Sequence, residues 1–593
     1  MKTVGVGNEF FHDFIENDSY YVDKTPFIRT VFKENPSKVM LITRPRRFGK
    51  TLTMSTFYDF LSLNPENPGD VSRQEKWFRD TEIFKDKEFC NKYMGKFPVV
   101  FLTLKQASCS EFKKSYEQLG SVIYNLYDSF SYLESSKKLT DKDIALFKKT
   151  ADNKDYICDA ANSNKIIDSL RDLLMLLYRH HGKRPILLID EYDVPIAKAA
   201  HFGYYREMVD IMGPMLSNAL KTNEYLERAV LTGCLRAAKE SIFTGLNNFK
   251  ICSVLDSGKN DLSRGIGFTD EETKEVLTYY GLADCYEEVK NNYDGYNFGK
   301  IHMYCPWDVM SFCDDNRENT EEDKKLISAD NYWINTSGND VIEEFMGFIN
   351  PEDTDQMQAL LDGKSITADV KPSLCYGDLR NHNINDFWTL LLYTGYLTFN
   401  PATVQNLETD AGIRCELYIP NKEITKCFKS KIMEYYENNT ERKNYTADLI
   451  KALFAGNAEG IQNNLNNLLS KYVSVRDFST RAPKENYYHG FMNGLLVNGA
   501  SLVEEQQSNM ESGDGYVDLI VASKDSETVA VLELKQTGKP FGARVTIAEN
   551  ALKQVSERGY AAEFMEDPLV KNIYACGICF YKKHCAVTCK KLK

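Results

Sequence analysis

A lysine and a threonine follow a short apolar run near the N-terminus, separated from it by a loop of the length found in phosphate-binding sites. Residues 44–51 read Arg-Pro-Arg-Arg-Phe-Gly-Lys-Thr, after the strand-like residues Val39–Thr43 and before a helical pattern. A strand, a loop and a helix in this order are the context of a phosphate-binding loop, because main-chain N–H groups and a helix N-terminus attract anions. We expect Lys50 to reach the β and γ phosphates of ATP and Thr51 to hold Mg²⁺.

The loop departs from the usual Gly-x-x-x-x-Gly-Lys-Thr pattern, because Arg44 stands where the first glycine is expected. The turn must therefore be made differently, and Pro45 is placed to help. The pattern predicts nucleotide contacts from a run of six residues: Arg46, Arg47, Phe48, Gly49, Lys50 and Thr51. For the two arginines of this run, a phosphate contact and a structural ion pair both stay open.

Two adjacent carboxylates end a second apolar run, in which Ile186–Ile189 is followed by Asp190 and Glu191. Such a strand end beside a phosphate-binding loop predicts that Asp190 binds Mg²⁺ and that Glu191 polarises the attacking water. The alternative is a strand end that simply turns into solvent.

A third apolar run, Ala229–Leu231, leads into Thr232. We predict that Thr232 senses the γ-phosphate. Arg236 follows closely, and both a phosphate contact and a structural ion pair are open for it.

A carboxylate and an ammonium group stand two residues apart in the apolar run Val531–Lys535. Side chains alternate along a strand, so Glu533 and Lys535 share one face. Burying both without use would be costly in desolvation, and a metal site explains the pair. Asp518 and Glu533 would supply oxygen ligands to Mg²⁺ or Mn²⁺. Lys535 would ease deprotonation of the attacking water or stabilise charge at phosphorus.

The surrounding pattern predicts a helix over Lys484–Val497 and a hairpin formed by Val517–Ala522 and Thr528–Leu534, with Glu511–Tyr516 as a flexible approach loop. The hairpin would bring the two carboxylates side by side. Asp-x(n)-Glu-x-Lys on a hairpin is the PD-(D/E)XK nuclease signature, although the bare pattern arises often by chance.

The whole chain predicts an α/β protein in three parts. Residues 1–260 alternate apolar runs with helical patterns, which is typical of a P-loop domain with a parallel sheet. Residues 261–480 are mostly helical in pattern and would form a lid or linker. Residues 481–593 would form an α/β domain of the restriction-endonuclease type.

Composition excludes several classes of protein. The 593 residues are 43% hydrophobic and 26% charged, which excludes a disordered chain. The most apolar stretch, 387–399, is cut by threonines and a glycine, so we expect buried core rather than a membrane span. The first residues lack a secretory pattern, and we expect a cytoplasmic location with reduced cysteines.

The charge is unevenly distributed along the chain. The formal net charge is −13, but residues 535–593 contain eleven Lys/Arg and five Asp/Glu, a local net of +6. This basic end is a weak indication that the C-terminal part meets an anion.

Several quoted segments together resemble the AAA-ATPase-like proteins of anaerobic bacteria and their relatives, which carry RPRRFGK[ST] in place of the ordinary loop. The N-terminal part of the resemblance rests on YYVDKTPFIRTVF, LITRPRRFGKTLTMSTF, LLIDEYDVPI and LTGCLRAAKESIFTGLNN. It continues through NNYDGYNFG, YWINTSGN and YTGYLTF. Where this chain has Asn292 and Cys305–Asp308, the family often reads Trp and Asn-Pro-Trp-Ser. These departures touch none of the expected catalytic groups.

The C-terminal segments KENYYHGFMNGLL, SNMESGDGYVDLIV and VLELK resemble the PD-(D/E)XK nuclease domain that is commonly fused behind this ATPase. The resemblance implies that Glu485 is a third carboxylate and that His489 neighbours the metal or the scissile phosphate. A surface glutamate and a satisfied core histidine are the alternatives. It also implies that Gln554 faces the site from a helix.

The last cysteines, Cys576, Cys579, Cys585 and Cys589, could suggest a zinc or iron–sulfur site. Residues 574–581 alternate like a strand, however, which would point the first two to opposite faces, so we expect no metal there.

The sequence therefore predicts an ATP-hydrolysing protein with a Mg²⁺-dependent nuclease domain that cuts nucleic acid, with DNA the expected substrate and ATP as a gate. The rival is an ATP-dependent switch or scaffold, in defence for example, whose C-terminal domain binds nucleic acid or protein without cutting. The oligomeric state stays open.

Overall fold

The computed structural model describes residues 1–34, 37–162, 164–235, 249–256, 260–319, 329–333, 354–381, 383–407, 412–438, 444–472, 484–497, 502–512, 515–537, 541–582 and 584–593. The chain divides into two compact units. The first contains residues 1–336 and 365–424, and the second contains residues 337–364 and 425–593. The predicted division at residues 260 and 480 stays a prediction.

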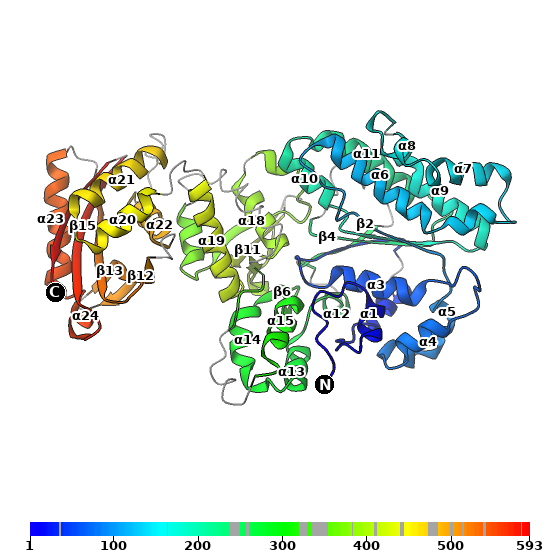
Figure 1. The fold of residues 1–593 in the computed structure, drawn as a ribbon, viewed down its shortest axis with the longest axis horizontal. Coiled ribbons are helices and arrows are strands. Elements are labelled where there is room, and N and C mark those ends of the chain that lie inside the picture. The colour runs from blue at the N-terminus through cyan, green and yellow to red at the C-terminus, as the bar shows by residue number, and fades with distance from the viewer. Residues whose placement is uncertain are drawn as a thin grey trace. The chain divides into compact units, whose positions relative to one another are not determined.

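A five-stranded parallel sheet forms the centre of the first unit (Figure 1), in the order β2-β3-β4-β1-β5. Its strands are β1 (Val39–Thr43), β2 (Val99–Thr103), β3 (Ile186–Asp190), β4 (Arg228–Gly233) and β5 (Phe249–Cys252). The strands expected from the apolar runs Val39–Thr43, Ile186–Ile189 and Ala229–Leu231, and from a fourth apolar run at Val99–Leu104, are confirmed. β5 was missed because it is a half-exposed edge strand that carries Lys250, so it lacks a continuous apolar run.

Helices cover both faces of this sheet, as a parallel sheet requires. α3 (Lys50–Leu61) lies on one face, while α6 (Phe112–Asp128), α9 (Asn164–His181) and α11 (Tyr205–Leu220) lie on the other (Figure 1). The remaining helices of this part are α1 (Phe11–Glu16), α2 (Pro26–Arg29), α4 (Ser72–Phe78), α5 (Lys87–Tyr93), α7 (Asp141–Ala151), α8 (Lys154–Cys158) and α10 (Val194–Phe202).

The middle of the chain contains both helices and short strands. The helices are α12 (Asn260–Arg264), α13 (Asp270–Tyr279), α14 (Tyr286–Tyr293), α15 (Pro306–Asn316), α17 (Thr354–Leu361), α18 (Ile384–Thr394) and α19 (Lys422–Asn438). The strands form the hairpin β6 (Tyr296–Phe298) with β7 (Ile301–Met303), and a small sheet of β8 (Ile366–Val370), β9 (Thr398–Phe399), β10 (Gln405–Asn406) and β11 (Ile413–Tyr418). The apolar stretch at 387–399 is buried in α18 and β9, as expected.

The second unit is built on another five-stranded sheet, β12-β13-β14-β15-β16. Its strands are β12 (Val503–Ser512), β13 (Gly515–Ser523), β14 (Thr528–Gln536), β15 (Asn572–Tyr581) and β16 (His584–Lys591). β14 and β15 are parallel, and the other neighbours are antiparallel. The predicted hairpin is therefore confirmed.

The expected loop over Glu511–Tyr516 is wrong at both ends, because Glu511 and Ser512 belong to β12, and Gly515 and Tyr516 belong to β13. β12 has no apolar run because it is an edge strand with a mostly polar sequence. Alternation alone therefore did not reveal it.

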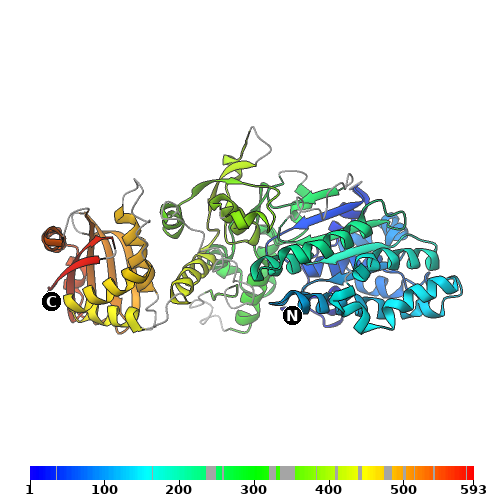
Figure 2. The same ribbon diagram turned by 90° about the horizontal axis from the view of Figure 1, so that it is seen from above.

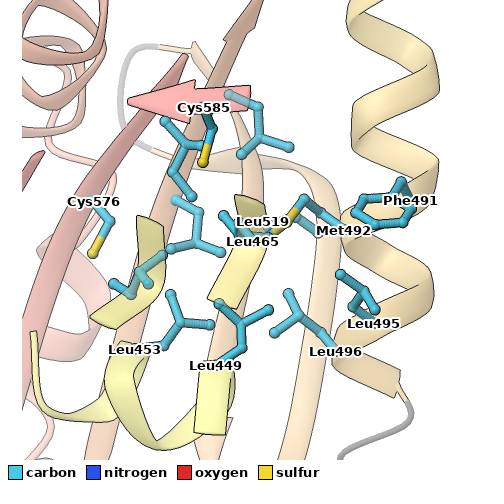
Figure 3. Packing of buried hydrophobic residues seen from close by; sticks show 14 of the residues in the cluster. Leu449, Leu453, Leu465, Phe491, Met492, Leu495, Leu496, Leu519, Cys576 and Cys585 are labelled. Atoms are coloured by element: carbon cyan, nitrogen blue, oxygen red, sulfur yellow. The ribbon is translucent and has the colours of Figure 1, made fainter. Parts of the chain in front are cut away.

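Helices also cover both faces of this second sheet (Figures 1 and 2). α23 (Phe541–Glu557) lies on one face, and α20 (Asn444–Phe454), α21 (Ala458–Tyr472) and α22 (Lys484–Val497) lie on the other, with α24 (Ala562–Glu566) after α23. Figure 3 shows the core on the α20–α22 side, where leucines of the helices meet Leu519, Cys576 and Cys585. In the described part of the chain, no helix is long and apolar enough to span a bilayer.

Candidate functional sites

The phosphate-loop candidate joins β1 to α3 with an unusual main chain. Arg47 has φ of +68° and Gly49, directly before α3, has φ of +89°. Left-handed residues in a short loop turn successive N–H groups toward one point, which favours an anion there. The main chain before α3 therefore has the left-handed residues of an anion-binding turn, and phosphate binding there stays a prediction.

Lys50 is buried, with 4% of its surface exposed. Its Nζ donates to the carbonyl oxygens of Arg44, at 3.2 Å, and Pro45, at 3.1 Å. It also lies 3.5 Å from Oε1 of Glu191. The ammonium group therefore spans the loop and the carboxylates at the end of β3.

Side chains that follow β1 and end β4 meet the carboxylate of Asp190, at the end of β3. Its carboxylate accepts hydrogen bonds from the hydroxyls of Thr51, at 2.7 Å, and Thr232, at 2.5 Å. This convergence follows from topology, because β4 lies between β1 and β3 and all three end at one edge. Burial, together with the nearby Glu191, raises the pKa of Asp190 to about 6.

The donor set at this edge fits Mg²⁺. The ion prefers hard oxygen ligands in octahedral geometry, and a carboxylate with an adjacent threonine hydroxyl supplies two of them. Desolvation destabilises the charged form of a buried carboxylate and so raises its pKa. A bound cation stabilises that charged form.

Asp193 is a residue of this site that the sequence reasoning missed. Its Oδ2 accepts from the main-chain N–H groups of Cys234 and Leu235, both at 2.9 Å, and from the hydroxyl of Tyr376 at 3.3 Å. Asp193 thus fixes the turn that follows Thr232. Its position three residues after Asp190 was the feature of the sequence that could have identified it. Arg236 lies outside the described residues.

Arg44, the residue in place of the first glycine, has a structural role. Its fully buried guanidinium donates to the carbonyl oxygens of Thr43, at 2.9 Å, Cys252, at 3.2 Å, and Leu262, at 3.1 Å. It also lies over the ring of Phe298. The side chain therefore ties the loop to β5 and α12.

Other side chains of the loop contact the middle of the chain. Phe48 packs against Tyr296 and Phe298 of β6, each with ring centroids 5.0 Å apart. Arg47 donates to the carbonyl oxygen of Tyr332 at 2.7 Å and lies over the ring of Trp307 at 4.8 Å. A glycine-rich loop has no such side chains, so this loop can bind phosphate with its backbone and the middle region with its side chains.

The second candidate site lies on the hairpin of β13 and β14. Leu519 pairs with Leu532, so the same register places Asp518 opposite Glu533. Oδ2 of Asp518 accepts the main-chain N–H of Leu534 at 2.7 Å. Nζ of Lys535 lies 2.9 Å from Oε1 of Glu533. The three predicted residues are therefore brought together.

Glu533 is almost fully buried, at 2% exposure, and its Oε2 has no hydrogen-bond partner among the described residues. Burial and the neighbouring Asp518 raise the pKa of Glu533 to about 7. An oxygen atom in this condition suits cation binding, since a cation would compensate for the lost solvation. No group of three or more potential metal-binding side chains occurs in the part of the chain that the structure describes.

His489 on α22 contacts the strand of Asp518. Its Nε2 lies 2.9 Å from the main-chain oxygen of Asp518, and its Nδ1 lies 3.4 Å from Nδ2 of Asn493. Both ring nitrogens thus have partners, which agrees with the satisfied-core alternative. Glu485 is the second residue of the same helix, but its side chain lies outside what the structure describes.

Gln554 and Arg558 meet at the end of α23. Nε2 of Gln554 lies 3.4 Å, and Nη1 of Arg558 lies 3.2 Å, from the hydroxyl of the buried Tyr560. This face of the sheet also carries Glu533, and Arg558 is one of the positive charges that act on it.

In the described chain, the C-terminal cysteines form no disulfide and belong to no group of three or more potential metal-binding side chains. Cys576 packs on the α20–α22 side of the sheet, and Cys579 packs beside Ala548 of α23. The prediction of opposite faces is confirmed.

Comparison with known proteins gives a family match for each of the two regions that contain a candidate site. Residues 5–243 match a family model described as a predicted AAA-ATPase. Residues 483–590 match the PD-(D/E)XK nuclease superfamily. The chain thus contains an AAA-ATPase-like domain and a nuclease-superfamily domain.

A relative of similar length is known by sequence. An uncharacterized protein in the vnfD 5′ region of Azotobacter chroococcum mcd 1 is 22% identical over 570 residues, which cover 95% of this chain and 94% of that protein. No solved structure matches the chain.

Proposed function

We propose that the N-terminal site binds and hydrolyses ATP with Mg²⁺. The observation that carries this proposal is the meeting of Lys50, Thr51, Thr232 and Asp190 at one sheet edge. Thr51 and Asp190 would hold Mg²⁺, which when bound neutralises phosphate charge. Lys50 would exchange its carbonyl partners for the β and γ phosphates, and Glu191 would orient the attacking water.

We further propose that the C-terminal site hydrolyses phosphodiester bonds of nucleic acid, with DNA the expected substrate. The observation that carries it is the buried Oε2 of Glu533, which has no hydrogen-bond partner among the described residues and lies opposite Asp518 and beside Lys535. Asp518 and Glu533 would hold Mg²⁺ or Mn²⁺, which supplies electrophilic catalysis when bound. Lys535 would stabilise the negative charge that develops at phosphorus, and Gln554 would orient the substrate.

A binding role without cleavage is the second candidate. Glu533 is already paired with Lys535, and burial raises its pKa to about 7, so the acid form is populated at neutral pH. A site in that state would bind nucleic acid or protein through Lys535 without cutting. ATP would then operate a switch or scaffold.

The test is cleavage of linear, circular and single-stranded DNA, and of RNA, in Mg²⁺ or Mn²⁺ with and without ATP. Lys535→Ala is expected to lower the cleavage rate by about 100-fold or more, because it removes a charge that acts on the transition state. Lys524→Ala is the matched control, since Lys524 is an exposed lysine at the turn of the same hairpin.

Cleavage that survives in Lys535→Ala would contradict the assigned role of the lysine. Absence of cleavage on every substrate, with ATP hydrolysis intact, would favour the binding role. The reactions with ATP test whether ATP controls cleavage. A wild-type cleavage rate that is the same with and without ATP would contradict such control.

A further inference from the structure

One peptide group in the middle region is held from both sides, by the guanidinium of Arg47 and the carboxyl group of Glu423. The carbonyl oxygen of Tyr332 accepts from Nη1 of Arg47 at 2.7 Å. The main-chain N–H of Trp333 donates to Oε1 of Glu423 at 2.5 Å. These two atoms belong to the same planar peptide bond, so Arg47 and Glu423 are connected through one rigid group.

The Glu423 end of this connection is shielded from water, while the Arg47 end is half-buried. Glu423 is fully buried and Trp333 is 2% exposed. The indole of Trp333 packs edge-on against Tyr396, with centroids 4.7 Å apart. Hydrogen bonds in such surroundings are strong and costly to lose, because water cannot replace a missing partner.

The charges around the peptide group support the connection. Asp308 is also buried, and burial together with Asp308 raises the pKa of Glu423 to about 9. The guanidinium of Arg47 is the positive charge that acts on both acids. An uncharged Glu423 at neutral pH still accepts the N–H of Trp333 through its carbonyl oxygen.

The two ends of the connection lie in different functional elements. Arg47 belongs to the loop before α3, where its left-handed φ sets the direction of the neighbouring N–H groups. Glu423 lies in the first turn of α19, the helix along which the chain leaves the first unit at residue 424.

We propose that Glu423 is a positioning residue for the nucleotide site, which holds Arg47 through the Tyr332–Trp333 peptide and couples the start of α19 to triphosphate binding at the loop. The proposal rests on the proposed binding of ATP. A bound triphosphate attracts the guanidinium of Arg47 and so changes the hydrogen bond between Arg47 and the carbonyl oxygen of Tyr332. The rigid peptide group transmits this change to Glu423 through the N–H of Trp333.

The test measures ATP affinity and the kcat and KM of ATP hydrolysis in the full-length protein. Glu423→Ala is expected to weaken ATP binding about 10-fold, mainly through KM. Glu423→Gln should stay within about twofold of wild type, because it keeps the acceptor oxygen. Lys429→Ala, at an exposed position on the same helix, is the matched control.

A double-mutant cycle with Arg47→Ala separates coupling from general damage. If the peptide connects the two residues, Arg47→Ala/Glu423→Ala binds ATP no more weakly than Arg47→Ala alone. Losses that multiply would overturn the proposal, as would wild-type affinity in a folded Glu423→Ala. If Glu423→Ala fails to fold, wild-type affinity in Arg47→Ala would overturn it. Failure of the wild type to bind ATP would remove the proposed function itself.

Discussion

Oxygen atoms of the protein surround the ammonium group of Lys50. In the nucleotide-bound state that we propose, phosphate oxygens take the place of some of them. Two carbonyl oxygens and a carboxylate oxygen of Glu191 surround Nζ of Lys50 within 3.5 Å. Its positive charge therefore already offsets part of the negative charge of Asp190 and Glu191. The same lysine would balance the site with and without a nucleotide.

Lys50→Met is expected to lower ATP hydrolysis by about 100-fold or more, because it removes the charge nearest the transferred phosphoryl group. A steady-state ATPase assay measures the effect. Lys85→Met, which removes an exposed lysine, is the control and should keep wild-type activity. Equal losses in both variants would contradict the role of Lys50.

At the residue scale, the sequence predicted which polar residues meet at the sheet edge better than it predicted the role of Arg44, which begins the phosphate loop. The proximity of Thr51, Asp190 and Thr232 was predictable, because the parallel strands β1, β3 and β4 end at one edge and α3 begins shortly after β1. The role of Arg44 was not, because its partners Cys252 and Leu262 lie more than 200 residues away. Such long-range contacts leave no local periodicity in the sequence.

At the scale of elements, the phosphate loop is fixed by its neighbours as much as by its own sequence. Gly395 ends α18 with φ of +95°, and a Cβ atom there would lie 2.8 Å from Cβ of Pro45. The end of α18 therefore abuts the loop directly. Any displacement of one requires a displacement of the other.

Gly395→Ala is expected to weaken ATP binding several-fold, because the added methyl group pushes Pro45 and shifts the loop. It should also lower the free energy of unfolding by about 1–2 kcal/mol through left-handed strain. ATP titration and chemical denaturation measure the two effects.

Gly203→Ala is a closely matched control. Gly203 also ends a helix in a left-handed conformation, with φ of +86°, but has no atom near its missing Cβ among the described residues. It should lose similar stability and keep wild-type ATP affinity. Equal effects of both variants on ATP would show that strain, rather than contact with Pro45, is responsible.

The elements themselves were predicted unevenly, for a physical reason. Buried strands such as β1 and β3 carry continuous apolar runs and were found. The edge strands β5 and β12 are partly solvated or polar, so hydrophobic patterning did not mark them. His489 shows the same limit, because only the fold revealed its contact with the main chain of Asp518.

At the scale of the molecule, each of the two units has its own sheet and its own candidate site. We expect two unfolding transitions in calorimetry. Mg²⁺ and ATP should raise only the transition of the first unit, by an amount that corresponds to about 2.7 kcal/mol at 100 times the dissociation constant. Lys50→Met should abolish this shift. A single transition that moves as a whole would contradict independent unfolding.

The chain passes between the units three times, at residues 336/337, 364/365 and 424/425. α17, from the short middle passage, packs against α22 of the nuclease-superfamily domain and buries Met357 and Leu360. A nonsense mutation near codon 480 would therefore not produce a well-folded ATPase domain on its own. It would leave α17 without α22 and expose apolar side chains to the proteases and chaperones of the cell. The two domains are consequently expected to be inherited, and lost, together.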